Sequence, residues 1–409
     1  MAKPIGMLFF VREAFPTSRV DVDVLFGREL LGRGHCIDFV MQAASAESAP
    51  GATPWRGRTV FVGPTDIGQS KWHRLRKYSL GLWHDLRSLS LVRADRYDAV
   101  QVRDKFVAAA VALPLAHYRG LKFFFWLSFP EPEAQLQGGC EGGSRFPLVN
   151  RVRGQIFDWL LYRWILPRCD HAFVQSEQMR SDLGRRNIDV SKLTPVPMGI
   201  DLADIAKFAG TRSSSRVSPD SPLVLGYLGT LNRQRKLDVL VDMLAIVRSK
   251  GFDARLLLVG DGDKPGDRQR ILDRAAALGL QGHIEITGML PREQALRRIL
   301  QADIALSPFF PTLVLQSTSP TKLVEYLALG LPVVANHHPE QRRVLRATRA
   351  GVCVPWRPRH FARGVIWLAR QSTETRQQMA ARGRNWVIQH RTYARIADDL
   401  EKKYQQLLN

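Results

Sequence analysis

Two charged side chains interrupt an otherwise apolar helix pattern in the last quarter of the chain. The segment SPTKLVEYLALGLPVVAN (319–336) places Lys322 in the first helical turn and Glu325 one turn later on the same face. Serine favours the N-cap and proline the first helical position, so we expect Ser319 and Pro320 in these roles. The helix dipole disfavours a lysine there by about 0.3–1 kcal/mol, and a bound anion would reverse that balance. The segment therefore indicates an anion site, with a solvated Lys–Glu pair as the alternative.

A second group of cations follows a predicted strand. In GYLGTLNRQRKLDVLVDMLAIV (226–247) the strand ends at Gly229 and a helix begins near Lys236. The loop between them contains Arg233 and Arg235. Guanidinium groups beside a helix N-terminus can bind an anion. A solvated basic loop explains the same residues equally well.

A third segment combines glycine and aspartate after a strand. LLLVGDGDKPGD (256–267) contains Gly260 and the DxD pair Asp261 and Asp263. Such a pair can bind a divalent metal that carries a diphosphate, but a Gly/Asp turn between strand and helix needs no metal. We favour the structural interpretation and expect no metal requirement.

Short apolar runs alternate with helical patterns along the whole chain. The predicted strands are 5–11, 36–41, 59–63, 97–102, 122–128, 171–175, 223–229, 254–260, 284–289, 302–308 and 332–336. This alternation is typical of βαβ units on parallel sheets, where ligands bind beyond the carboxyl ends of strands. The Ser/Pro/Arg-rich segment 210–222 is interpreted as a loop just beyond a linker. The sequence thus predicts two doubly wound α/β domains.

Bulk composition excludes several classes of protein. The chain has 409 residues, of which 45% are hydrophobic and 24% charged, as in ordinary globular proteins. The four cysteines are scattered, which argues for a reducing compartment and against a disulfide framework or structural zinc site. No apolar run is long enough to span a membrane, and we interpret the N-terminal segment as a buried strand and not as a signal peptide.

The net charge of +21 favours anionic partners, namely nucleic acid, an acidic membrane face or phosphorylated small molecules. Basic residues are in excess in both halves of the chain, and no zinc spacing, RNP-like strand or basic heptad supports nucleic-acid binding. Segments 71–91 and 151–168 interleave basic and aromatic residues at helical spacing, which suits an anionic membrane surface. Core-facing helices with a basic outer face explain this spacing nearly as well.

These segments, in this order, resemble glycosyltransferase family 4, the retaining nucleotide-sugar transferases with the GT-B fold. The resemblance is carried by GTLNRQRKLD (229–238), VGDGD (259–263) and above all 319–336, with weaker matches at 29–40, 173–188 and 196–201. It implies an α/β architecture of two Rossmann-like doubly wound domains facing a cleft. Residues 1–200 would bind the acceptor and residues 201–389 the nucleotide sugar, with a C-terminal helix at about 390–409 returning to the first domain.

The resemblance also assigns roles to individual residues. Arg235 matches the family's diphosphate-binding lysine, Lys322 and the Thr321–Leu323 backbone lie near the phosphates, and Glu325 matches the second glutamate of the E-x7-E motif, which holds the ribose. Cations and helix N–H groups placed there stabilise the charge that develops on the leaving diphosphate. Retention by front-face attack demands no protein nucleophile. The further donor-binding residues implied are Gly229, Thr230, Arg233, Gly260, Ser317, Ser319, Thr321 and Leu323.

Three positions depart from the family pattern. Ser317 stands where the first glutamate of E-x7-E would be, so main-chain amides of 316–319 would have to take over its contacts. Thr230 replaces the arginine that follows the strand glycine, which leaves Arg233 or Arg235 to provide the charge. The N-terminal phosphate loop, usually Gly-Gly, reads FPTSRVDVD (15–23).

On the acceptor side, VQVRDKF (100–106) ends a strand with charged residues where many relatives carry histidine and an acidic residue. Asp104 could orient an acceptor hydroxyl, or the segment could be a charged strand-end loop. SFPEPEAQLQGGCEGGSRFP (128–147) is predicted to be a Gly/Pro/Glu-rich loop with the length of an acceptor-binding lid.

We therefore expect a retaining, metal-independent glycosyltransferase that moves a sugar from a nucleoside diphosphate sugar to a hydroxyl of a glycan or lipid-linked acceptor. By analogy it acts in cell-surface polysaccharide or glycolipid assembly, in the cytoplasm and peripherally at the cytoplasmic face of the inner membrane. The rival hypotheses are a non-enzymatic nucleic-acid- or anion-binding protein, a sugar-nucleotide epimerase of the same architecture, and a phosphorylase, for which no pyridoxal lysine is identifiable.

Overall fold

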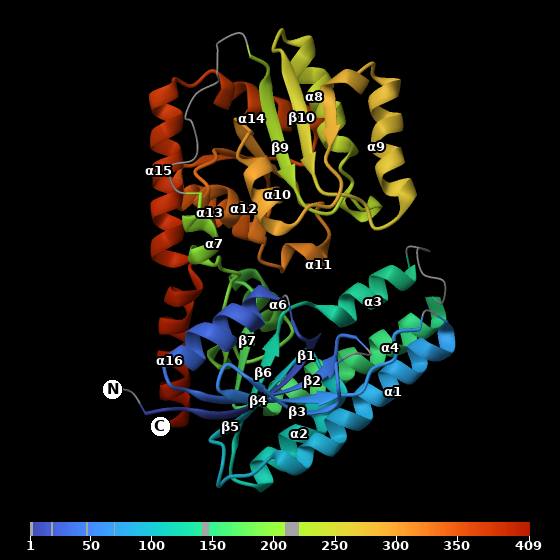
Figure 1. Ribbon diagram of the computed structural model, residues 1–409, viewed down its shortest axis with the longest axis vertical. Coiled ribbons are helices and arrows are strands. Elements are labelled where there is room, and N and C mark those ends of the chain that lie inside the picture. The colour runs from blue at the N-terminus through green and yellow to red at the C-terminus, as the bar shows by residue number, and fades with distance from the viewer. Residues whose placement is uncertain (1–2, 18, 46–47, 69, 141–146, 209–220) are drawn as a thin grey trace. The chain divides into compact units, whose positions relative to one another are not determined.

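The protein consists of two compact units (Figure 1). The computed structural model describes residues 3–17, 19–45, 48–68, 70–140, 147–208 and 221–409. The first unit comprises Met1–Met198, Ser317–Ser319 and Tyr393–Asn409, and the second comprises Gly199–Gln316 and Pro320–Thr392. Of the predicted loop 210–222, residues 210–220 lie outside the described residues.

The first unit is built on a mainly parallel sheet in the order β3-β4-β2-β1-β5-β6-β7-β8, in which only the β3–β4 pair of the described strands is antiparallel. Its strands are β1 (Gly6–Phe15), β2 (Cys36–Ala43), β3 (Gly51–Trp55), β4 (Arg58–Gly63), β5 (Ala99–Arg103), β6 (Lys122–Leu127), β7 (His171–Val174) and β8 (Leu193–Pro195). The sequence missed β3 and β8, which occupy the two ends of this order.

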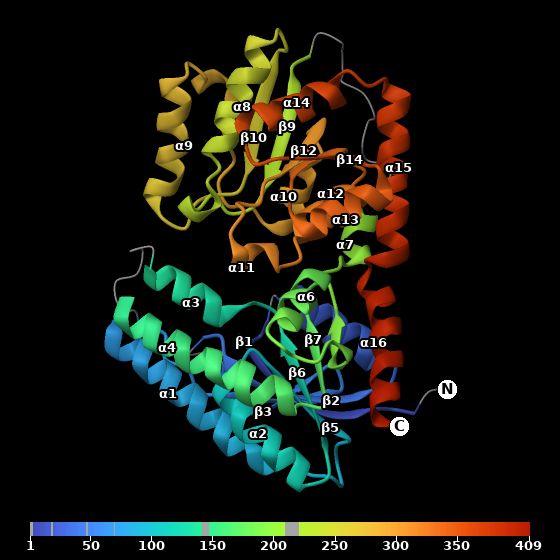
Figure 2. The same ribbon diagram turned by 180° about the vertical axis from the view of Figure 1, so that it is seen from behind.

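Helices cover both faces of this first sheet (Figures 1 and 2). They are η1 (Asp21–Leu30), α1 (Lys71–Ser88), η2 (Leu89–Leu91), α2 (Phe106–Tyr118), α3 (Glu131–Cys140), α4 (Pro147–Trp159), η3 (Leu160–Ile165), α5 (Leu166–Arg168), α6 (Glu177–Arg185), η4 (Val190–Lys192) and α16 (Tyr393–Leu408). Successive residues of β1 enter opposite cores: Leu8 packs with α2, and Phe9 packs with η1 and α16. This burial on both faces explains why the strands read as continuous apolar runs.

The segment 128–147, which the sequence presented as a loop of the length of a lid, is helical from Glu131 onward where it is described. Residues 131–140 form α3, α4 begins at Pro147, and residues 141–146 lie outside the described residues. The prediction of an irregular loop over 128–147 was therefore wrong. Glu131 and Glu133 lie in the first turn of α3, where acidic side chains favour a helix.

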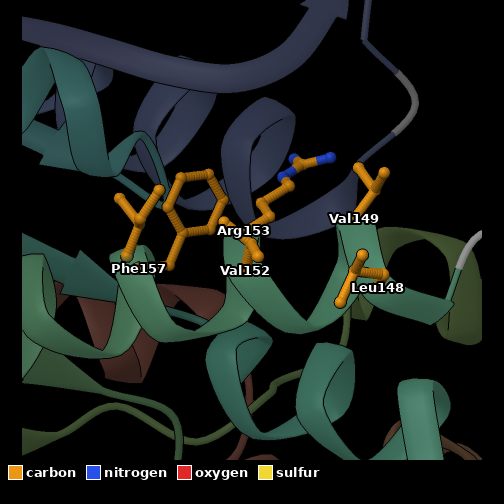
Figure 3. A pocket seen from close by; sticks show the side chains of 6 residues that line it. Leu148, Val149, Val152, Arg153 and Phe157 are labelled. Atoms are coloured by element: carbon orange, nitrogen blue, oxygen red, sulfur yellow. The ribbon is translucent and has the colours of Figure 1, made fainter.

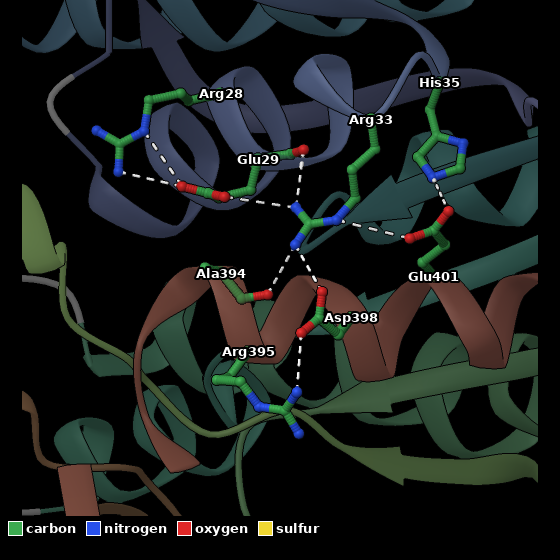
Figure 4. A network of polar contacts seen from close by, with 8 residues as sticks. All are labelled: Arg28, Glu29, Arg33, His35, Ala394, Arg395, Asp398 and Glu401. Carbon is green, nitrogen blue, oxygen red and sulfur yellow. Dashed lines mark hydrogen bonds and ion pairs between the residues drawn. The ribbon is translucent and has the colours of Figure 1, made fainter. Parts of the chain in front are cut away.

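The C-terminal helix α16 belongs to the first unit and is held against η1 by apolar and ionic contacts. Arg33, three residues after η1, donates a hydrogen bond to the carbonyl of Ala394. The same guanidinium forms ion pairs with Asp398 at 2.8 Å and Glu401 at 3.6 Å (Figure 4). Inside the core, the Tyr404 hydroxyl donates to Gln101 on β5. The last residues of the chain are therefore part of the N-terminal fold.

The second unit is a parallel sheet in the order β11-β10-β9-β12-β13-β14. Its strands are β9 (Leu223–Leu228), β10 (Ala254–Val259), β11 (Ile284–Ile286), β12 (Ile304–Ser307), β13 (Val333–Asn336) and β14 (Gly351–Val354). Its helices are α7 (Leu202–Ala206), η5 (Arg233–Arg235), α8 (Asp238–Ser249), α9 (Pro265–Ala277), η6 (Gln281–His283), α10 (Arg292–Ile299), α11 (Leu313–Gln316), α12 (Thr321–Ala328), α13 (Pro339–Thr348), α14 (Pro358–Ala369) and α15 (Thr373–His390). β14 was not predicted.

Each sheet has a point where the strand order changes direction. In the first unit β1 lies between β2 and β5, and in the second β9 lies between β10 and β12. Ligands of open parallel sheets bind outside the carboxyl ends of the strands at such a point. In the second unit this places the loops after β9 and β12 on the two sides of the expected ligand position.

Candidate functional site

The helix α12 begins one residue later than expected. Pro320 is its N-cap, with φ −66° and ψ 114°, and Thr321 is its first residue. The Ser319 hydroxyl does not cap the helix, because it accepts a hydrogen bond from the Met198 backbone N–H at 3.0 Å. The assignment of Ser319 as N-cap was therefore wrong, since a contact distant in sequence took the side chain that local propensity would have used.

The first turn of α12 has backbone donors that no side chain caps. No side chain among the described residues caps its N-terminus; at the other end the helix stops at Ala328, two residues before the left-handed Gly330 with φ +71°. The N–H groups of Thr321, Lys322 and Leu323 belong to this first turn and have no partner within the helix. An anion placed there would receive these donors and the positive end of the helix dipole.

Lys322 packs against the end of β9. A Cβ atom at Gly229 would lie 2.3 Å from Lys322 Cε and 2.7 Å from Nζ, so the lysine occupies the space that the glycine leaves open. The Nζ atom lies 5.7 Å from the centre of the Tyr227 ring. The Tyr227 hydroxyl donates to the carbonyl of Thr230 at 3.1 Å, which ties the loop after β9 to the same strand.

Gly229 and Gly260 are adjacent in space at the ends of β9 and β10. Their φ values are +142° and +139°, and a Cβ at Gly260 would lie 2.3 Å from the Gly229 carbonyl oxygen. The Gly229 N–H donates to Val259 at 2.9 Å. The end of β10 can approach β9 this closely only because Gly260 has no side chain, whereas the absence of a side chain at Gly229 leaves room for Lys322.

The basic loop after β9 forms a short 3-10 turn, η5, before the helix α8 begins at Asp238. Lys236 takes a left-handed conformation between them with φ +51°, so the expected helix start near Lys236 was two residues early. The Arg235 guanidinium lies 5.5 Å from the centre of the Phe309 ring, which follows β12. The Arg233 side chain is exposed, and its backbone N–H donates to Asp267.

Lys322 and Arg235 form no ion pair with any residue that the structure describes. Burial, and then the positive charge of Arg235, lower the pKa of Lys322 to about 8, against the opposing charge of Glu325. Among the residues that the structure describes, Lys322 Nζ has no hydrogen bond or ion pair. Two neighbouring cations at the switch point, neither in an ion pair with a described residue, form a site for an anion.

One carboxylate oxygen of Glu325, which lies one turn further along α12, is already in an ion pair. Its Oε1 pairs with Nη2 of Arg292 at 3.0 Å, and Arg292 Nε pairs with Asp204 at 3.1 Å. Sequence reasoning missed Arg292 and Asp204. No local pattern marks them, because Arg292 lies 33 residues from Glu325 along the chain.

The DxD pair makes contacts with the protein itself. Asp261 accepts from the Gly262 N–H at 2.8 Å and lies 3.6 Å from Arg268, and Asp263 accepts from Asn232 at 3.2 Å. Within the described ranges, no group of three or more His, Cys, Asp or Glu side chains is arranged to bind a metal ion.

Ser317 and Ser319 cluster with the first unit. The Ser317 hydroxyl donates to Asp182, and its carbonyl accepts from the Ser176 hydroxyl at 2.6 Å. Ser317 therefore stands in a polar contact with α6. A role for the 316–319 main chain at the donor sugar stays a prediction.

Asp104 closes β5 of the first unit and is buried in a left-handed conformation with φ +52°. It accepts from the Ser128 N–H at 2.9 Å and from the Ser128 hydroxyl. Burial raises its pKa to about 6, although Arg103 and Ser128 act in the opposite direction. Arg103 is itself fully buried and pairs with Asp21 at 2.8 Å and Glu13 at 3.2 Å. This charged cluster lies beyond the carboxyl ends of β1 and β5, at the first unit's switch point.

Two family models match the chain. One, described as Glycosyltransferase Family 4, covers residues 24–204, and the other, Glycosyl transferases group 1, covers residues 222–371. Together the two matches support a glycosyltransferase of the family 4 type. The resemblance inferred from its motifs is thereby confirmed.

Curated relatives match part of this chain. It is 28% identical over 200 residues to a GDP-mannose-dependent alpha-(1-6)-phosphatidylinositol dimannoside mannosyltransferase of Mycobacterium tuberculosis, over 48% of each chain. It is 33% identical over 130 residues to a phosphatidyl-myo-inositol mannosyltransferase of Mycobacterium leprae, over 32% of each. The chain thus spans about half or less of the length of the curated relatives it matches.

Solved structures match over nearly the whole length. A sucrose-phosphate synthase from Thermosynechococcus elongatus superimposes with a TM-score of 0.72 at 16% identity, covering 98% of this chain and 99% of that one. Anabaena HepE in complex with UDP gives a TM-score of 0.65 at 15% identity, covering 98% and 100%. These likenesses establish the fold: two α/β domains with mostly parallel sheets, the GT-B fold, as predicted.

Proposed function

We propose that the protein is a retaining glycosyltransferase that moves a sugar from a nucleoside diphosphate sugar to a hydroxyl of a glycan or lipid-linked acceptor. The observation that carries this proposal is the unpaired Lys322, which lies beside Gly229 and Arg235 at the uncapped start of α12. A diphosphate supplies the negative charge that this site lacks. The family matches and the lipid-linked acceptors named for the mycobacterial relatives support the same substrate class.

The reaction breaks the bond between the anomeric carbon and the oxygen of the β-phosphate, whose electron pair stays on the leaving nucleoside diphosphate. The acceptor hydroxyl oxygen bonds to the same face of that carbon, and its proton passes to the leaving phosphate oxygen. Lys322, Arg235 and the N–H groups of Thr321–Leu323 stabilise the charge that accumulates there, without reorganising during the reaction. Glu325 binds the ribose hydroxyls.

This arrangement provides cationic stabilisation from side chains, so we propose that no metal ion is required. Asp261 and Asp263 are engaged by Gly262, Arg268 and Asn232. Lys322 and Arg235 take the place that a divalent cation holds in other transferases, which is to neutralise the departing diphosphate.

Calorimetric titration with UDP, GDP, ADP and CMP tests the donor site, on wild type, Lys322→Ala and Glu325→Ala at moderate salt. GDP deserves the first titration because a matching relative is named as GDP-mannose-dependent. Selective binding of one diphosphate, weakened by both substitutions, supports the proposal. Equal, weak and salt-sensitive binding of all four would show a generic anion-binding surface and overturn it.

The acceptor side lies in the first unit, where Asp104 would orient the acceptor hydroxyl from its buried position at the end of β5. The hydrogen bond from Ser128 fixes the carboxyl group of Asp104. The preceding residue, Arg103, is held by ion pairs with Glu13 and Asp21. Because the carboxyl group is already held in one conformation, it can accept a hydrogen bond from an acceptor hydroxyl without a further loss of conformational freedom.

The first unit also presents a surface suited to an anionic membrane. On α1 the exposed large apolar residues are Trp72, Leu75, Tyr78, Leu82, Trp83 and Leu86, and the exposed basic residues are Lys71, Arg74, Arg76, Lys77 and Arg87. On α4, exposed Leu148, Val149 and Val152 line an apolar hollow of about 360 Å³ (Figure 3). Arg153 borders it and lies over the rings of Tyr78 and Phe157, which joins the two helices.

We propose that this surface, made of the exposed faces of α1 and α4, binds the anionic cytoplasmic face of the inner membrane peripherally. Apolar side chains flanked by basic ones combine burial at the headgroup boundary with attraction to anionic lipids. Among the described residues, no helix has the length and apolarity to cross a bilayer. Such a location would suit assembly of cell-surface polysaccharide or glycolipid.

A further inference from the structure

Arg292 connects two carboxylates of the second unit that come from separate elements. It is the first residue of α10, and its guanidinium joins Asp204 on α7 to Glu325 on α12, at 3.1 Å and 3.0 Å. The negative charges of Glu325 and Asp204 raise the pKa of Arg292 against the opposing effect of its burial, so the guanidinium stays charged. One arginine therefore fixes the position of the glutamate relative to the rest of the unit.

The two oxygens of Glu325 are used differently. Oε1 accepts from Arg292, and no described residue donates a hydrogen bond to Oε2. Most of the Glu325 side chain is covered, with 13% of its surface exposed, and its charge acts on Lys322. Oε2 is thus the oxygen left for a ligand, on the same helix as the proposed phosphate-binding turn.

A glutamate side chain has three rotatable bonds, and fixing it removes freedom that binding would otherwise have to remove. An arginine fork is well suited to this, because its planar donors hold a carboxylate oxygen in one direction. Asp204 in turn holds the arginine from its other edge through Nε. The three side chains form a relay of ion pairs that runs from Asp204 through Arg292 to Glu325.

We propose that Arg292, itself held by Asp204, is a positioning residue that directs Oε2 of Glu325 toward the ribose hydroxyls and so sets the preference for ribonucleoside over 2′-deoxyribonucleoside diphosphates. This inference rests on the proposed function, because it requires a nucleoside diphosphate at α12. Arg292 itself touches no substrate atom. Its effect is confined to the ribose end of the ligand and leaves the diphosphate contacts of Lys322 and Arg235 in place.

The test measures dissociation constants for UDP, GDP and their 2′-deoxy counterparts on wild type, Arg292→Gln, Arg292→Lys and Asp204→Asn. The matched control is Arg297→Gln, on the same helix, which removes an exposed arginine paired with Glu293 at 2.8 Å. A hydrogen bond to a charged group corresponds to a preference for the ribonucleotide of about tenfold or more. Thermal melting of each variant reports folding separately.

We expect Arg292→Gln to lower that ribo-to-deoxy preference toward unity, mainly by weakening the ribonucleotide, whereas Arg297→Gln keeps it. Arg292→Lys and Asp204→Asn should give intermediate ratios, because each leaves part of the relay. An unchanged ratio in Arg292→Gln, with binding and discrimination intact in wild type, would overturn the positioning role alone. If the wild type binds no nucleoside diphosphate, the proposed function itself fails, and the two failures are distinguishable.

Discussion

The side chain of Lys322 occupies the space where a Cβ of Gly229 would stand. The nearest approach of such a Cβ is 2.3 Å to Lys322 Cε, and the glycine's φ of +142° is one that side-chain-bearing residues rarely adopt. The lysine of α12 and the end of β9 are thereby fitted to each other, although 93 positions separate them in the sequence. The position of the Lys322 ammonium group on α12 therefore depends on the absence of a side chain at Gly229, at the end of β9.

Gly229→Ala should therefore abolish or strongly weaken nucleoside diphosphate binding while the protein still folds. The added methyl group meets the flexible end of Lys322, which can move away, so the main loss is the position of Nζ. Gly251→Ala is the control: it has φ +84°, and no atom lies within 4 Å of its would-be Cβ. Both substitutions should cost about 1 kcal/mol or more in stability from backbone strain, and only Gly229→Ala should change the affinity in calorimetry. Equal affinity in both variants would contradict the prediction.

The lowered pKa of Lys322 predicts a pH dependence of diphosphate binding. In the free protein the ammonium begins to lose its proton near pH 8, and an anion beside it raises the pKa again, so binding takes up a proton above that pH. Affinity should fall by up to about tenfold per pH unit between about pH 8 and 10. Calorimetry in two buffers of different ionisation enthalpy measures the proton uptake. In Lys322→Arg the guanidinium stays charged, so a slope that persists there would assign the dependence to another group.

Much of the fold followed from local patterns in the sequence, and the exceptions have physical reasons. Predicted strands such as β6 and β10 have apolar runs that are buried on both faces of the sheet. The missed β3 contains Pro54 and is mostly exposed, and β8 and β14 are short segments at the ends of the strand order. Edge strands bury less apolar surface, so their sequences carry a weaker signal.

The candidate site was predictable only where its residues lie in contiguous motifs. Arg235, Lys322 and Glu325 stand in segments with recognisable helix and strand boundaries. The Arg292–Glu325 pair joins elements that no periodicity relates. The same is true of the Tyr326 hydroxyl, which accepts a hydrogen bond from the Leu228 N–H and donates one to the Leu228 carbonyl. For Ser319 a local rule gave the wrong answer. Serine favours the N-cap, but its hydroxyl accepts a hydrogen bond from the Met198 N–H and does not cap the helix.

The raised pKa of Asp104 predicts that the free energy of unfolding decreases as the pH rises from acid to neutral. Its pKa in the folded protein, about 6, lies above the ordinary value of 3.8, so the fold retains the proton. The stabilisation is fully present below pH 3.8 and is lost as the pH rises through 6, by at most about 3 kcal/mol. Asp104→Asn cannot ionise and accepts a left-handed backbone. The wild type should therefore lose stability relative to Asp104→Asn between pH 4 and 7 in denaturant titrations, and parallel curves would assign the carboxyl an ordinary pKa.

Transfer activity should survive chelation. Because Lys322 and Arg235 provide the cationic stabilisation, we expect less than about a twofold change in rate after dialysis against EDTA. Asp263→Asn should be equally mild, since Asp263 is exposed and its described partner is Asn232. Lys322→Ala is the positive control and should reduce the rate by about 10²-fold or more. Recovery of a chelated, inactive enzyme by Mg²⁺ or Mn²⁺ would show that a metal carries the diphosphate after all.

The exposed surface of α1 should make membrane binding depend on both apolar and basic residues. Trp72→Ser with Trp83→Ser removes apolar burial, and Arg74→Glu with Lys77→Glu removes attraction to anionic lipid; both pairs are exposed, so the fold should tolerate them. We expect each pair to reduce co-sedimentation with phosphatidylglycerol-containing vesicles by about tenfold, with little binding to phosphatidylcholine alone.

The charge-matched control is Lys250→Glu with Lys402→Glu, and the aromatic control is Trp367→Ser on α14. If the charge-matched control weakens binding as much as Arg74→Glu with Lys77→Glu, the overall positive charge of the chain is responsible and α1 has no special role. If only the charge reversals act, α1 is an electrostatic contact whose apolar side chains do not enter the lipid.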